Sequence, residues 1–186
     1  MEAPRLAERA AIEAAVWAEL GQAVRLKDHP WRVGVLATRD GAGADARSVV
    51  LRELDAATRR LLIYTDARSP KARQIEAHPA ALLVLWSPAL GWQLRVRLEL
   101  ELQTSGLAVS SRWAKLKLTP AAQDYLSPLP PGSPLDAPAA APPQRESRDH
   151  FAVIAAEVRA IDWLELAAPG HRRAVFEPGS ARWVAP

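Results

Sequence analysis

Three short segments carry residue types that can hold a phosphate group. The first is the run 47–52, which begins with Arg47, and the second is Tyr64–Thr65. The third is Ser69–Pro70–Lys71, which has the composition of a helix start, a capping residue followed by proline. Free backbone N–H groups at a helix start, with a hydroxyl and an ammonium beside them, form an anion site. If the first two segments belong to one hairpin, a guanidinium, an ammonium and hydroxyls can surround one phosphate.

Short strands must position most of these segments. Residues 92–102 give the clearest pattern, because apolar residues alternate there with polar ones at the period of a strand with one buried face. Many short strands with hairpin-length connections favour a mainly β, antiparallel barrel. The sequence has no βαβ alternation and no glycine fingerprint of a dinucleotide-binding fold. We expect strands over residues 31–38, 46–54, 60–65, 80–86, 92–102, 150–158, 160–166, 172–176 and 181–184, and helices over 6–26, 70–77 and 105–126, the last broken at Pro120.

Length and composition predict a single domain over residues 1–186, with an N-terminal helix inside 1–28. Residues 127–143 contain seven prolines, which exclude a helix interior or a central strand. We therefore expect a Pro-rich surface loop over 127–149. It is interpreted as a lid beside the site or a disordered linker, with a polyproline-type partner ligand as the alternative.

Composition excludes several classes of site. The sequence has no cysteine, which rules out disulfides, thiolate zinc sites and a cysteine nucleophile and fits a cytoplasmic location. The four histidines lack the spacing of a metal site. Charges interrupt the first twenty residues, so we expect no signal peptide, and no apolar run is long enough to span a membrane. The net charge of +3 is scattered rather than gathered in stripes, so nucleic-acid binding is not favoured.

The order of these motifs resembles the core of pyridoxamine 5′-phosphate oxidase and its FMN-binding relatives. The resemblance rests on the runs RSVVLR from Arg47, YT from Tyr64, SPKARQIEAHP from Ser69 and WQLRV from Trp92. A weaker match continues through Trp163 and residues 171–173. The resemblance implies an antiparallel split β-barrel of the FMN-binding type with N-terminal and peripheral helices. It also implies a homodimer with FMN at the subunit interface and an oxidoreductase that passes hydride through the flavin.

The same resemblance assigns roles to individual residues. Gln93 hydrogen-bonds to the flavin ring from the partner subunit, and Arg52 and His171 are the catalytic candidates. The residues implied to hold the FMN phosphate are Arg47, Thr65, Ser69 and Lys71. The complete set of cofactor-binding residues is Arg47, Val49, Val50, Leu51, Arg52, Tyr64, Thr65, Ser69, Pro70, Lys71, Gln93 and Arg173.

The sequence departs from the oxidase pattern at several points. Pro70 stands where the oxidase has arginine, and Arg52 stands where it has lysine. No counterpart of the oxidase's Tyr, Arg and Ser set for the substrate phosphate follows Leu102. The pattern is closer to the family's divergent bacterial branch, so oxidation of pyridoxamine phosphate itself is not implied.

Two other functions remain open at this stage. One is a non-catalytic module of the same fold that stores or senses FMN or haem, and the other is a phosphosugar or nucleic-acid binder without flavin. Several candidates also have purely structural alternatives. These are Arg47 and Arg52 as solvated strand ends, Gln93 and His171 as ordinary surface residues, and Trp92 and Trp163 as core residues rather than flavin contacts.

Overall fold

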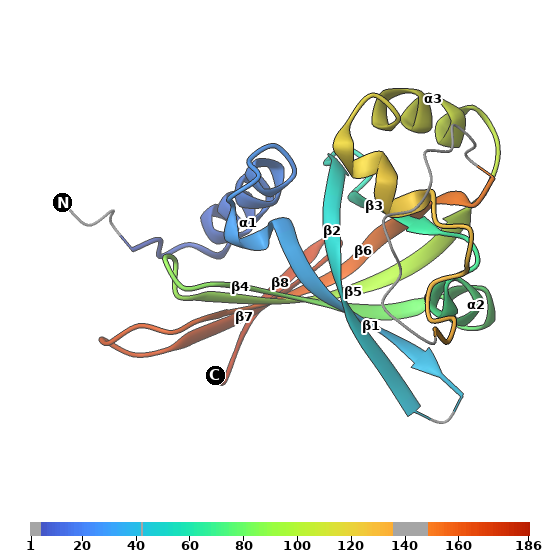
Figure 1. The fold of residues 1–186 in the computed structure, drawn as a ribbon. Helices are drawn as coiled ribbons and strands as arrows, with labels where there is room; N and C mark the ends of the chain where they lie inside the picture. Colours follow the sequence, from blue (N-terminus) through green and yellow to red (C-terminus); the bar gives the residue numbers. More distant parts are fainter. Residues whose placement is uncertain (1–4, 42, 136–148) are drawn as a thin grey trace.

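The computed structural model describes residues 5–41, 43–135 and 149–186, and Figure 1 shows their arrangement. The helices are α1 (Arg9–Ala23), α2 (Pro70–Ala77) and α3 (Leu107–Leu116), with short 3₁₀ helices η1 (Pro30–Arg32) and η2 (Pro120–Tyr125). The strands are β1 (Val33–Asp40), β2 (Gly43–Asp55), β3 (Arg60–Asp66), β4 (Ala80–Ser87), β5 (Trp92–Gln103), β6 (Phe151–Glu165), β7 (Arg172–Glu177) and β8 (Ser180–Val184). Of the expected Pro-rich loop, residues 136–148 lie outside the described residues.

The strands form an antiparallel sheet that closes on itself. Their order is β3-β2-β1-β4-β5-β6-β7-β8, and β3 also pairs with β6. This extra pairing closes six strands into a barrel and leaves β7 and β8 as an extension. The first half of β6 pairs with β3 and its second half pairs with β7, so one long strand serves both parts. The expected mainly β, split-barrel fold is confirmed.

One expected boundary is wrong. Residues 150–158 and 160–166 were predicted as two strands, whereas β6 runs without interruption from Phe151 to Glu165. The pairing of β6 with β5 shifts in register there, and Arg159 is the extra residue on the β6 side. A bulge lets a strand continue past a residue that breaks its alternation. Arg159 is exposed between two buried residues. Because it interrupts the apolar pattern, the sequence predicts a strand end at the position of the bulge.

The core fills the barrel, and α1 covers one side of it. Ile12, Val16 and Leu20 recur on the inner face of α1 and are fully buried. Trp163 is also fully buried, and its ring meets that of Trp92 edge to face at 5.4 Å. These two tryptophans are therefore core residues of the barrel. Edge-to-face packing of this kind adds stability beyond the area that is buried.

A smaller apolar cluster lies under α3 and η2, at the end of the barrel away from α1 (Figure 1). Phe151, at the start of β6, contacts the rings of Trp113 and Tyr125 at 5.3 and 5.4 Å. The expected helical segment 105–126 therefore exists as two pieces, and Pro120 begins the second. None of the helices in the described ranges is long and apolar enough to cross a membrane.

Candidate functional site

The start of α2 lies directly behind the end of β3. Pro70 occupies the first turn, where its missing N–H costs nothing, and Ser69 precedes it with extended backbone angles. The Ser69 side chain was expected to cap the helix, but it makes no capping hydrogen bond. It is fully buried instead, and its Oγ lies 3.3 Å from Oγ1 of Thr65. Pro70 has no N–H, and the Ala72 N–H donates to the backbone oxygen of Ser69 at 3.0 Å, so the helix start offers few backbone donors and a ligand must rely mainly on side chains.

Lys71 points back from the helix to β3. Its Nζ donates to Oγ1 of Thr65 over 3.1 Å, and Thr65 is only 3% exposed. Burial lowers the pKa of Lys71, and the nearby positive charge of Arg47 lowers it further. Two cations held this close repel each other, which indicates a place prepared for an anion between them.

Arg47 reaches the same helix from β2. Its Nη1 donates to the backbone oxygen of Leu36 at 3.2 Å and to Oγ1 of Thr38 at 2.6 Å. Its Nη2 donates to Oε1 of Gln74, one turn into α2, at 2.8 Å, and to Oδ2 of Asp45. The hairpin of β1 and β2 and the helix α2 therefore fix this guanidinium together.

A third cation near the helix start is already neutralised. Arg68 forms a two-point ion pair with Asp66, with Nε to Oδ1 at 3.0 Å and Nη2 to Oδ2 at 2.6 Å. The same guanidinium also donates to the backbone oxygens of Ser127 and Pro128, at the start of the Pro-rich loop. Arg68 thus holds Ser127 and Pro128, and Arg47 and Lys71 are the cations that lie nearest to Thr65 and Gln74.

The sequence predicted Arg47, Thr65, Ser69 and Lys71 as one cluster, and the structure brings all four together around the first two turns of α2. The donor set is two cations, two hydroxyl groups and a helix start, and this set fits a phosphate monoester. We refer to these four residues as the phosphate cluster. Val49 and Leu51 point into the core and Val50 lies on the opposite face of β2, as the alternation predicts.

Sequence reasoning missed three members of this neighbourhood. They are Thr38, Asp45 and Gln74, and Thr38 and Gln74 are almost completely buried. A signal was present, because Thr38 pairs with Asp45 across the β1–β2 hairpin and Leu36 pairs with Arg47. Starting the second strand at Gly43 would have put Asp45 on the same face as Arg47, and the hairpin pairing would have placed Thr38 opposite Asp45.

Arg52 and Tyr64 lie in a separate cluster. The pairing of β2 with β3 shifts between Leu51 and Glu53, so Arg52 sits at a bulge, and a bulge re-aims its side chain. Nη2 of Arg52 donates to the hydroxyl of Tyr125 at 3.3 Å, and the guanidinium carbon lies 5.6 Å from the centre of the Tyr64 ring. Its Nε is buried, with no hydrogen-bond partner among the described residues.

The Tyr64 hydroxyl is also occupied. It donates to Oε1 of Glu53 at 2.6 Å, and Glu53 forms a two-point ion pair with Arg112 of α3 at 2.9 Å for both contacts. Burial and the Glu53 carboxylate raise the pKa of Tyr64, so this hydroxyl stays protonated and acts as a donor. The side chains of Arg52 and Tyr64 thus connect the barrel to the α3–η2 end, and among the described residues neither forms a hydrogen bond to a side chain of the phosphate cluster.

The remaining candidates are partly or fully exposed and lie on β5, on β7 and in the turn before β7. Gln93 of β5 pairs in register with Trp86 and Leu164 and is partly exposed. Arg173 of β7 is held by Asp162, with Nε to Oδ1 at 2.8 Å and Nη2 to Oδ2 at 2.7 Å. His171 is exposed, and its Nδ1 accepts a hydrogen bond from a backbone N–H in the preceding turn. Within one chain, the structure does not bring these three residues to the phosphate cluster.

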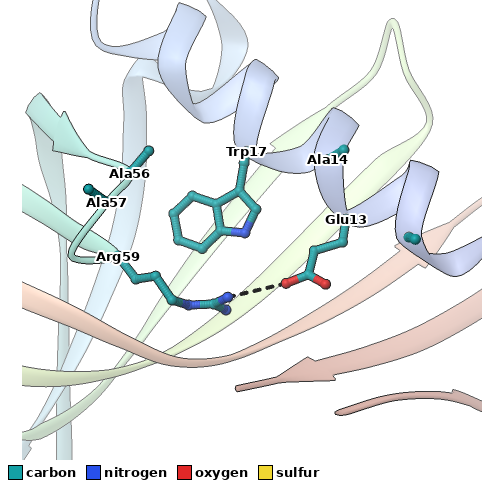
Figure 2. Close-up of a pocket in the computed structure, with 7 residues that line it drawn as sticks. Glu13, Ala14, Trp17, Ala56, Ala57 and Arg59 are labelled. Atoms are coloured by element: carbon teal, nitrogen blue, oxygen red, sulfur yellow. Dashed lines mark hydrogen bonds and ion pairs between the residues drawn. The ribbon is translucent and has the colours of Figure 1, made fainter. Parts of the chain in front are cut away.

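A cavity of about 470 Å³ lies elsewhere, between α1 and the β2–β3 turn (Figure 2). Arg59 lies over the Trp17 ring at 4.8 Å, and its Nη1 forms an ion pair with Glu13 at 3.3 Å. The charged groups drawn in Figure 2 thus pair with each other, and the remaining lining consists of alanines. This cavity is open and holds no member of the phosphate cluster, so its size alone does not make it the functional site.

Comparison with known proteins agrees with the sequence resemblance. Residues 12–104 match the family model described as pyridoxamine 5′-phosphate oxidase, FMN-binding domain. The chain is 46% identical over 63 residues to the pyridoxine/pyridoxamine 5′-phosphate oxidase of Azorhizobium caulinodans and 44% identical over 57 residues to that of Thermosynechococcus vestitus. These alignments cover 33% and 31% of this chain but only 29% and 26% of the two relatives.

Solved structures match over nearly the whole chain. A pyridoxamine 5′-phosphate oxidase-related, FMN-binding protein from Nostoc punctiforme superposes with a TM-score of 0.75 at 25% identity, and 98% of this chain and 100% of that one are covered. PhzG from Burkholderia lata superposes with a TM-score of 0.71 at 16% identity, covering 95% of this chain and 92% of that one. At that identity, the second match supports the fold alone. The phosphate cluster lies inside the region that the family model matches.

Proposed function

Because the chain belongs to the pyridoxamine 5′-phosphate oxidase FMN-binding family, we propose that it is a flavoprotein that holds the FMN phosphate at the start of α2. The observation that carries this proposal is the convergence of Arg47, Thr65, Ser69 and Lys71 on one helix start. Such a site neutralises a phosphate with two cations and satisfies its remaining oxygens with hydroxyl and backbone donors.

Each part of the cluster has a separate role in this proposal. Lys71 supplies a mobile point charge, whereas Arg47 supplies a planar fork whose direction is fixed by its neighbours. Thr65 and Ser69 are buried hydroxyls that donate to the ligand once it takes the place of their mutual contact. Pro70 supplies no donor, but it keeps the helix start in place.

We further propose that the protein is an oxidoreductase. Bound FMN supplies the redox chemistry, which is the reversible uptake of hydride at its ring. The residues of this chain contribute position and charge. Arg52 is proposed as the cation beside the reacting centre, because Tyr64 and Tyr125 hold its guanidinium half-buried with a buried donor still unpaired. Such a donor is costly unless a ligand or water satisfies it.

A homodimer would complete the site, and an apolar patch on the outer face of the barrel supports one. Val33 and Val35 on β1 are 50% and 44% exposed, and Trp86 on the neighbouring β4 is 42% exposed. An exposed patch of aromatic and aliphatic side chains is typical of a protein interface. Gln93 pairs with Trp86 in register and therefore borders this patch. This is where it would have to lie to reach a flavin in the other subunit.

A specific observation also favours a second function, that of a binding module without catalysis. Arg173 is neutralised by Asp162, and His171 lies in an exposed turn, so neither is poised for chemistry in the single chain. Both functions share FMN, the homodimer and a cytoplasmic location, and neither needs a membrane or a nucleic acid as partner. They differ only in turnover.

Two measurements test the proposal. Calorimetric titration with FMN and with riboflavin should give one FMN per chain and a much weaker affinity for riboflavin, because riboflavin lacks the phosphate. Equal affinity for both ligands would contradict the phosphate site. Anaerobic mixing of the FMN-loaded protein with nicotinamide or amine reductants then separates the two functions. Reduction of the bound flavin by one of them, seen as the loss of its visible absorbance, supports the oxidoreductase, and reduction by none of them supports the binding module.

A further inference from the structure

The guanidinium of Arg47 is already engaged by an anion of the chain itself. We propose that Asp45 is an internal substitute for the ligand phosphate, which the phosphate must displace from Arg47, so that Asp45 lowers the affinity for phosphorylated ligands. This inference rests on the proposed FMN site and adds a residue that limits its affinity.

Arg47 has five N–H donors, and four of them have partners. Nη1 donates to the backbone oxygen of Leu36 and to Thr38, and Nη2 donates to Gln74 and to Asp45. Nε has no hydrogen-bond partner among the described residues. It is open to solvent, because it is not among the unpaired donors that are buried. A phosphate that takes two parallel N–H groups from an arginine needs one edge of the fork. On the edge formed by Nε and Nη2, the Nε donor is free and Nη2 donates to Asp45.

Asp45 is not needed to orient the guanidinium. Thr38 and Gln74 are 3% and 8% exposed, so these two neutral acceptors are fixed in the fold. Together with the backbone oxygen of Leu36 they hold both terminal nitrogens of Arg47. The Asp45 side chain, by contrast, is 42% exposed, and water can replace the hydrogen bonds that it accepts from Arg47 and Gln74. Asp45 therefore contributes charge to the site more than it contributes position.

The charge of Asp45 acts against a phosphate. Hydrogen bonds from Gln74 and from Arg47 lower the pKa of Asp45, so it carries a full negative charge at neutral pH. This charge offsets one of the two cations of the cluster, and a phosphate that enters beside it meets electrostatic repulsion. Removing this charge leaves both cations to the ligand.

The test is a comparison of Asp45→Asn with the wild-type protein. Asparagine keeps an acceptor for Arg47 and for Gln74, so the fold is retained and only the charge is lost. We expect FMN to bind about five- to tenfold more tightly, the effect of one half-exposed charge beside a phosphate, with riboflavin affinity unchanged. Asp28→Asn removes an exposed carboxylate from the turn after α1 and controls for net charge. It should change neither affinity.

The outcomes separate the competing explanations. An unchanged or weaker FMN affinity in Asp45→Asn, in a protein that melts like wild type and binds riboflavin normally, overturns the inference and makes Asp45 a positioning residue or a bystander. Should the asparagine variant unfold, the same comparison is made between Asp45→Ala and the wild-type protein. In both proteins inorganic phosphate is also titrated as a competitor of FMN, and it should compete better in the variant. If neither protein binds FMN at all, the proposed function fails and this inference fails with it.

Discussion

Replacing Lys71 with methionine separates ligand binding from folding. Methionine keeps an unbranched, apolar side chain of similar length and removes only the charge and its donors. In the free protein, burial and the charge of Arg47 already lower the pKa of Lys71, so its charge is a cost there. The variant loses a single hydrogen bond, to Thr65, which is worth about 1 kcal/mol. The free energy of unfolding should therefore stay within about 1 kcal/mol of the wild-type value.

Binding of FMN should respond much more strongly. A hydrogen bond to a charged group contributes about 1.5–3 kcal/mol, and two unit charges 4 Å apart near a protein surface attract each other by up to about 4 kcal/mol. Lys71 is half-buried, so we take about 2 kcal/mol as the loss. Since 1.4 kcal/mol is tenfold in affinity, Lys71→Met should weaken FMN binding about 30-fold.

Flavin fluorescence titration measures this change directly. The assay compares FMN with riboflavin on the wild type, on Lys71→Met and on Lys117→Met, which alters an exposed lysine at the end of α3. Only the affinity of Lys71→Met for FMN should differ from the wild-type value; its affinity for riboflavin, and both affinities of Lys117→Met, should be unchanged. An equal loss of riboflavin affinity would mean that Lys71 supports the fold rather than the phosphate. An unchanged FMN affinity would refute the placement of the phosphate at α2.

Three further outcomes are expected. Gly91→Ala should destabilise the protein by about 2–4 kcal/mol in denaturant titration. Gly91 has φ +64°, and a Cβ there would lie 2.6 Å from the backbone oxygen of Leu166. A loss below about 1 kcal/mol would contradict that contact. The hydrogen bonds from Arg173 lower the pKa of Asp162 against the opposing effect of burial, so unfolding free energy should fall as pH drops below about 4, and Asp162→Asn should flatten that slope in acid melts. Trp86→Lys should convert a dimer to a monomer in sedimentation experiments, and a dimer that persists would place the interface elsewhere.

The sequence was sufficient where local patterns determine the structure. Strand alternation fixed β5, and the Ser69–Pro70 pair located the start of α2 at the residue where the structure has it. Hairpin pairing of neighbouring segments then brought Arg47 within reach of Lys71. These are contacts between elements that are close in the chain, and short-range rules suffice for them.

The same short-range rules do not predict irregular strand pairing. A period of two puts Arg52 on the face of Ser48 and Val50, but the bulge in β2 turns it to Tyr125, which is 73 positions away in the sequence. The bulge at Arg159 likewise hid the continuity of β6. A bulge depends on the strand opposite, and a single strand's composition does not encode it. Asp45 was missed for a different reason. It lies just before the predicted start of the second strand at residue 46, and its contact with Gln74 joins positions 29 residues apart.

FMN binding is tested first by a visible absorbance spectrum of the purified protein, recorded again after FMN is added and the excess is removed by desalting. A protein that holds FMN at the phosphate cluster should stay yellow and keep the two visible flavin bands at about one FMN per chain, and Arg47→Ala should lose most of that colour. A wild-type protein that emerges colourless from the desalting step would contradict the central claim, and would leave the phosphate cluster as a site for a different phosphorylated ligand.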